Sequence, residues 1–111
     1  MISEIKGERS FDTLADVMEI AFSLAEDENV MEFVKRGEGI PEGEDALEWQ
    51  MRIMKKCVPA MIRDHKDALA SLIAISKNTT KAKYLKDVTP NELWKDVIAI
   101  FNDKTFIGFL S

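Results

Sequence analysis

Hydrophobic residues recur at spacings of three and four along most of the chain, which is the period of an amphipathic α-helix. The first such stripe begins after Ser10, a predicted N-cap, and consists of Phe11, Leu14, Ala15, Met18, Ala21, Phe22 and Ala25. Glu26-Asp27-Glu28 is expected to open a second, short helix that carries Val30, Met31, Phe33 and Val34. Residues 1–9 lack this period and predict an N-terminal arm, with at most a short strand around Ile2 and Ile5.

A loop and a long helix follow. Residues 37–44, Gly-Glu-Gly-Ile-Pro-Glu-Gly-Glu, predict a flexible acidic loop. Asp45 and Glu48 resemble a capping box that starts a helix running to about Cys57. This helix bears two adjoining apolar stripes: Ala46, Trp49, Ile53 and Cys57, then Leu47, Met51, Met54 and Val58. Stripes this wide can contact the core on one side and a partner on the other.

The second half of the chain continues the helical pattern. Pro59 predicts a kink or a fresh start, because proline cannot donate a helical hydrogen bond. Asp64 and Asp67 predict the cap of a helix that ends near 77–80, and a short helical turn is expected around 82–85. Thr89-Pro90-Asn91-Glu92 is a strong start signal for a helix whose apolar stripe is Leu93, Trp94, Val97, Ile98 and Phe101. A short helical tail is expected to carry Phe106, Ile107, Phe109 and Leu110. The chain is therefore expected to be all-α: a small irregular bundle of about six helices in one domain.

Composition agrees with one folded domain. The chain has 111 residues, of which 46% are hydrophobic and 32% charged, which argues against disorder. No apolar stretch approaches the roughly 20 residues of a membrane span, and no signal peptide is recognisable. A single cysteine, Cys57, excludes an intrachain disulfide and favours a reducing, cytoplasmic setting.

Charge is split between the two halves. Residues 1–48 hold 14 acidic and 4 basic side chains, a net of −10, whereas residues 49–111 hold 6 acidic and 11 basic, a net of +5. Two interpretations stay open: solvated helical surfaces, or halves that attract each other within or between chains. The second predicts a weak, salt-sensitive homo-oligomer.

Candidate chemistry is sparse. His65, the only histidine, has no metal-ligand spacing and predicts a surface or capping role, and Cys57 lies on an apolar stripe and predicts an inert buried thiol. The glycines of 37–44 do not match a phosphate loop. Basic residues of the second half could track nucleic-acid phosphates, but the chain is acidic overall, at −5. We expect no catalytic site, no cofactor, no metal and no nucleic-acid or membrane partner.

Methionines cluster around the predicted proline kink. Met51, Met54 and Met61 lie near Trp49 in the sequence, and Met suits surfaces that accept varied apolar partners. Core filling is the alternative. The partner-binding hypothesis names Trp49, Met51, Met54 and Met61, with Lys55 and Lys56 steering acidic segments of the partner.

Three stretches resemble a known family. Ile5-Lys6-Gly7-Glu8-Arg9 running into Leu14-Ala15-Asp16-Val17-Met18 resembles the start of tail assembly chaperones from long-tailed phages and prophages of Gram-positive bacteria. Asp64-His65-Lys66-Asp67 through Leu72-Ile73-Ala74 resembles their central helix. Thr89-Pro90-Asn91-Glu92-Leu93, followed by Ile100-Phe101-Asn102-Asp103 and an aromatic end, resembles their C-terminal part, and residues 36–50 match least.

The resemblance implies a function. Members bind the tape measure protein in the host cytoplasm, keep this long helical polypeptide soluble, help recruit tail tube subunits around it, and are absent from the finished virion. A small helical adaptor or regulator encoded by a phage, which binds a host or phage protein, is the alternative.

Overall fold

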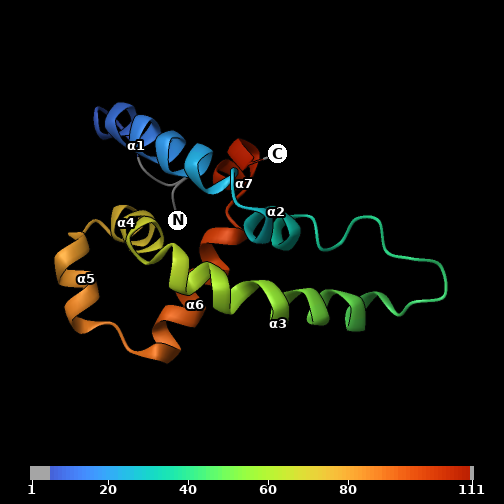
Figure 1. Cartoon of the computed structure of the whole chain (residues 1–111). Coiled ribbons are helices and arrows are strands. Elements are labelled where there is room, and N and C mark those ends of the chain that lie inside the picture. Colours follow the sequence, from blue (N-terminus) through green and yellow to red (C-terminus); the bar gives the residue numbers. More distant parts are fainter. Residues whose placement is uncertain (1–5, 111) are drawn as a thin grey trace.

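The computed structural model describes residues 6–110 and folds them into seven helices without a strand (Figure 1). The helices are α1 (Arg9–Leu24), α2 (Glu28–Val34), α3 (Ala46–Asp64), α4 (Lys66–Ser76), α5 (Lys81–Asp87), α6 (Pro90–Phe101) and α7 (Lys104–Leu110). The predicted all-α class is confirmed. The expected strand around Ile2 and Ile5 lies outside the described residues.

Side-chain caps fix five of the helix starts. Asp45 accepts a hydrogen bond from the Glu48 amide at 3.0 Å, and Thr89 accepts one from the Glu92 amide at 3.2 Å, as the sequence predicts. Asp27, Thr80 and Asp103 cap α2, α5 and α7 in the same way. These local bonds satisfy amides that have no partner inside the helix.

Two predicted caps are wrong, and of the kink or fresh start predicted at Pro59 the fresh start is wrong. α1 begins at Arg9, so Ser10 lies in its first turn. α3 continues through Pro59 to Asp64, and α4 follows after one residue, so Asp64 ends a helix instead of capping one. The His65 amide donates to the Met61 carbonyl at the end of α3, and the His65 carbonyl accepts from the Leu69 amide at the start of α4, so His65 is the C-cap of one helix and the N-cap of the next. No side chain caps the start of α4.

An aromatic cluster joins the middle of the chain to its C-terminal part. The Phe33 ring on α2 meets the Phe101 ring on α6 edge-to-face at 5.1 Å, and Phe101 meets Phe106 on α7 at 5.5 Å. Aliphatic residues of α1, α3 and α4 complete the core around this cluster, among them Val17, Leu24, Met61, Leu72 and Ile73.

The inward face of α1 differs from the predicted stripe. Thr13, Val17, Ala21 and Leu24 are buried where α1 packs on α4 and α7. Of the predicted stripe only Ala21 is fully buried, and Phe11, Leu14 and Phe22 are 80%, 47% and 53% exposed. The physical reason is close packing: helices approach each other most closely through small side chains, and Thr13, Val17 and Ala21 are smaller than Phe11 and Phe22.

α3 extends beyond the rest of the bundle, and the loop before it extends further still (Figure 1). Its buried residues, Cys57, Val58 and Met61, all lie in its C-terminal half. The principal dimensions of 49 × 27 × 22 Å reflect this elongation. The N-terminal half of α3, residues 46–56, therefore keeps much of its apolar surface outside the core.

A buried polar network ties α5 to α6. The Tyr84 hydroxyl donates to Oδ2 of Asp96 at 2.6 Å, and Nζ of Lys77 pairs with Oδ1 of Asp96 at 3.1 Å. Burial, together with the Asp96 carboxylate, raises the pKa of Tyr84 well above its usual range, so the hydroxyl remains a donor.

Replacing this donor tests the network. Tyr84→Phe leaves a buried carboxylate oxygen without its hydrogen bond, and the free energy of unfolding should fall by about 1–3 kcal/mol. Urea denaturation measures it. Lys83→Met, an exposed neighbour, is the control and should stay within about 0.5 kcal/mol of the wild type. Equal stabilities of Tyr84→Phe and the wild type would contradict this role of the network.

Candidate functional site

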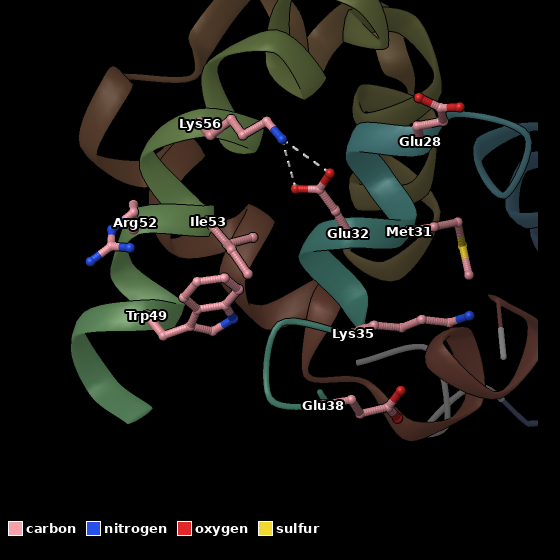
Figure 2. A pocket seen from close by; sticks show the side chains of 9 residues that line it. All are labelled: Glu28, Met31, Glu32, Lys35, Glu38, Trp49, Arg52, Ile53 and Lys56. Carbon is pink, nitrogen blue, oxygen red and sulfur yellow. Dashed lines mark hydrogen bonds and ion pairs between the residues drawn. The ribbon is translucent and has the colours of Figure 1, made fainter. Parts of the chain in front are cut away.

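A groove of about 850 Å³ lies between α2 and the extended half of α3 (Figure 2). α2 and the residues just after it, Lys35 and Glu38, contribute one wall, and α3 contributes the other. The lining residues are Glu28, Met31, Glu32, Lys35, Glu38, Trp49, Arg52, Ile53 and Lys56. Its volume is in the range of pockets that hold a drug-sized ligand or the side chains of a docked peptide.

The apolar part of the groove comes mainly from α3. Trp49 and Ile53, one helical turn apart, lie side by side and project into the space beside α2 (Figure 2). Both are only half-buried, as is Met31 on α2. The Arg52 guanidinium lies 5.7 Å from the Trp49 ring centre, where it is attracted by the ring face. A partner that covered these side chains would remove apolar surface from water.

Charged side chains of both signs surround this apolar part. Nζ of Lys56 on α3 lies 3.1 Å from Oε1 and 3.2 Å from Oε2 of Glu32 on α2, so the pair links the two walls. This hydrogen bond raises the pKa of Lys56 above its usual range. The pair is solvent-exposed, and exposed ion pairs contribute little to stability, so its main effect is on the position of the two side chains.

Cys57 lies beside this ion pair. Its thiol is buried and donates a weak hydrogen bond to Oε2 of Glu32, with Sγ at 3.6 Å. Burial first, and the Glu32 carboxylate second, raise the pKa of the Cys57 thiol. A thiol held in its neutral form is a poor nucleophile, which agrees with the predicted inert, buried cysteine.

His65 holds the N-terminal end of α2 in place. Its Nε2 lies 2.7 Å from Oδ2 of Asp27, the residue that also caps α2 through the amides of Asn29 and Val30. The hydrogen bond to His65 lowers the pKa of Asp27 below its usual range. Asp27 therefore attaches the start of α2 to the junction of α3 and α4, and the partner of His65 is not Cys57.

The structure divides the predicted partner-binding residues among three places. Trp49 and Lys56 line the groove, whereas Met51, Met54 and Lys55 lie on another face of α3, in an apolar hollow of about 310 Å³ that Val58, Pro59 and Trp94 complete. Met61 is 1% exposed and belongs to the core, so its assignment to a partner surface was wrong. Met61 continues the packing of Cys57 and Val58 one turn further along the same helix.

The α2 wall was not part of the predicted site. Met31, Glu32 and Lys35 reach the groove only because α2 packs along α3, and Glu32 is 24 positions from its partner Lys56. Each of these three residues is ordinary for a short exposed helix. No local pattern in the sequence marks them as neighbours of Trp49.

Other kinds of site find little support in the described part of the chain. Among residues 6–110, no group of three or more His, Cys, Asp and Glu side chains could hold a metal ion. Within the same range no helix combines the length and the apolar character needed to cross a membrane. The groove, with its apolar side chains and charged rim, is our candidate for a partner-binding site.

No protein-family model, curated protein or solved structure matches this chain.

The pairing of Asp27 with His65 gives a pH-dependent expectation. Because the folded-state pKa of Asp27 is lowered, its contribution to stability is present above the unfolded value, about 3.9, and is lost as pH falls through the folded value. Asp27→Asn keeps an N-cap of similar quality but removes the charge. The variant should be less stable than the wild type near pH 6, and the difference should shrink as the pH falls below the unfolded-state value of about 3.9.

Thermal unfolding monitored by circular dichroism at several pH values measures this difference. Glu26→Gln, one residue away and exposed, is the matched control and should show no such pH dependence. A constant gap between Asp27→Asn and wild type across the whole range would show that the charge of Asp27 has no stabilising role.

Proposed function

We propose that this protein is a tail assembly chaperone of a long-tailed phage or prophage, and that it binds the tape measure protein through the groove between α2 and α3. Two things support the proposal: the resemblance of the three sequence stretches to that family, and the groove itself. The groove carries the argument, because it offers a helical client an apolar surface outside the core.

The shape of the groove suits a helix. Two helices form its walls, and the half of α3 that bears Trp49 and Ile53 extends beyond the bundle, so the groove is open along its length. A third, amphipathic helix can lay its apolar face against Trp49, Ile53 and Met31 and keep its polar face in water. This arrangement repeats the packing of helix on helix that forms the core.

The side chains of the groove suit a client without one fixed epitope. Met31 is unbranched and adapts its shape to different apolar neighbours. Trp49 provides a large anchor of the type that dominates interface energies. The rim carries both Lys35, Arg52 and Lys56 and the acidic Glu28, Glu32 and Glu38, so segments of either charge find opposite charges there.

In this function the protein performs no chemical reaction. It covers apolar faces of the tape measure protein in the host cytoplasm while tail tube subunits are recruited, and it leaves before the virion is complete. Cys57 and His65 are structural in this account, because each is held in a hydrogen bond to a carboxylate of α2 or its cap.

Co-expression with the tape measure protein tests the proposal. That client is expected from a very long open reading frame immediately downstream of the gene. Trp49→Ala with Ile53→Ala should reduce the soluble fraction of the client at least severalfold. Truncation of large apolar anchors typically weakens the binding free energy by about 3–5 kcal/mol. Neither residue is fully buried, although Ile53 packs against the core, so the helical circular dichroism spectrum should persist with at most a lower melting temperature.

Met51→Ser with Met54→Ser is the matched control on the other face of the same helix. It should lower client solubility much less. Loss of the client with this control variant, and not with the Trp49 variant, would place the contact in the hollow beside Trp94 and contradict the proposal. If both variants still keep the client soluble, neither face of α3 binds it, and this result would also contradict the proposal.

A further inference from the structure

An apolar cavity of about 350 Å³ lies where the end of α3, α4, α5 and the start of α6 come together (Figure 1). Residues of all four helices line it, so it is bounded on several sides, unlike the groove between α2 and α3. The two sites share no lining residue. The apolar part of the cavity lining consists of Ile62, Leu69, Ala70, Tyr84, Leu85, Val88 and Leu93.

The interior of this cavity offers a ligand no polar partner. Tyr84 alone among the apolar lining residues has a polar side-chain atom, and its hydroxyl already donates to Oδ2 of Asp96 at 2.6 Å. Within the described part of the chain, no buried side-chain nitrogen or oxygen lacks a hydrogen-bond partner. A polar group that entered would lose its hydrogen bonds to water without gaining others. The part of a ligand that lies inside therefore has to be apolar.

Two basic side chains complete the lining. Arg63 on α3 and Lys66 on α4 lie on either side of the helix junction, and both are exposed, so they mark where the cavity opens to water. Neither forms an ion pair with another residue of the range 6–110. The acidic neighbours Asp64 and Asp67 do not line the cavity, and Asp67 lies 3.9 Å from Nζ of Lys81 on α5. The entrance is therefore positively charged.

The size of the cavity limits what can fill it. An α-helix with its side chains is about 10–12 Å across, so even two turns of a partner helix need more room than this cavity provides. Pockets that hold small molecules begin at about 300 Å³. At the packing density of a protein interior, 350 Å³ holds an aliphatic chain of roughly ten carbon atoms.

We propose that this cavity binds a single-chain aliphatic acid of roughly ten carbon atoms. The alkyl chain lies among Leu69, Leu85 and Leu93, and the carboxylate at the entrance pairs with Arg63 and Lys66. Burial of the chain removes apolar surface of both molecules from water, and a guanidinium can bind a carboxylate through two parallel hydrogen bonds. A neutral chain of the same length lacks the ion pair, and a cationic head group is repelled.

This inference is independent of the proposed function, because the groove of Trp49 and Ile53 contributes nothing to the cavity. The ligand would contact α4, α5 and α6 at once. Binding to the folded chain alone shifts the folding equilibrium, so the ligand should also raise the melting temperature. Client solubilisation and ligand binding are measured in different assays and can fail separately.

A series of three ligands with the same ten-carbon chain tests the proposal on the full chain. Decanoate, decanol and decyltrimethylammonium are titrated below their micelle concentrations and followed by two-dimensional amide NMR. Decanoate should bind one per chain and at least tenfold more tightly than decyltrimethylammonium, with decanol between them. The amide shifts should be largest in residues 62–70 and 84–93 and small at Trp49 and Ile53.

Two variants separate the contribution of the charges from that of the cavity. Arg63→Gln with Lys66→Gln should weaken decanoate binding at least fivefold and leave decanol binding unchanged; both residues are exposed, so the fold should persist. Lys95→Gln with Lys104→Gln makes the same change in net charge away from the cavity, and its decanoate affinity should stay within twofold of wild type.

Ala70→Leu fills part of the cavity from α4 and should weaken decanoate and decanol binding alike, at least tenfold. Ala70 is 3% exposed, so the melting temperature of this variant is measured first. If Ala70→Leu does not fold, the ligand series and the charge variant still decide the question.

Four results would overturn the proposal. Decanoate could fail to bind, or could shift amides elsewhere than around the cavity. Decyltrimethylammonium could bind as tightly as decanoate, which would show that the entrance does not select charge. Arg63→Gln with Lys66→Gln could bind decanoate like wild type. An acidic peptide of alternating Leu and Glu could bind more tightly than decanoate, which would identify a protein segment as the occupant.

Discussion

The edge-to-face contacts among Phe33, Phe101 and Phe106 are the interaction on which the rest of the structure depends. They join α2 to α6 and α7, which follow it by more than half of the chain. α2 is a short helix, and a short helix is not stable in water by itself. Phe33, with Asp27 bound to His65, keeps α2 against the bundle, and α2 in turn forms one wall of the groove. The candidate site therefore exists only while this cluster is packed.

The core of this small protein buries one face of each helix. α1 and α3 each carry a second apolar face, and these two faces stay outside the core. In α1 the buried face is Thr13, Val17 and Ala21, and Phe11 and Phe22 face away from it. In α3 the core ends near Cys57, and Trp49 and Met51 lie beyond it. Apolar side chains left in water favour association, and here they are accompanied by charge: acidic beside α1, basic along the middle of α3 and at its end. The free surfaces thus differ enough to bind different partners.

The helices could be predicted from the sequence because their signals are local. The three-four periodicity, Asp45 and Thr89 as caps, and the break at Asn102-Asp103 each act within a few residues, and the structure follows them. Which of two adjoining stripes turns inward is decided by packing between distant helices. For that reason the sequence predicted the stripe of Phe11 as the packing face of α1, although it is exposed, and placed Met61 on a partner surface, although it is buried. For the same reason no site was predicted to include Glu32 and the rest of the α2 wall. The groove residue Trp49 was found because a large aromatic residue on a wide apolar stripe is itself a local signal.

Fluorescence of Trp49 tests the central claim most directly. Trp94, the other tryptophan, is replaced in Trp94→Phe, so that Trp49 alone reports on the groove. Addition of a helical segment of the tape measure protein should shift the emission of half-exposed Trp49 to shorter wavelength and reduce its quenching by iodide, because the docked helix excludes water from the ring. Trp49→Phe, in which only Trp94 remains, should change far less. A Trp49 signal that stays constant while the client demonstrably binds would contradict a client-binding groove between α2 and α3.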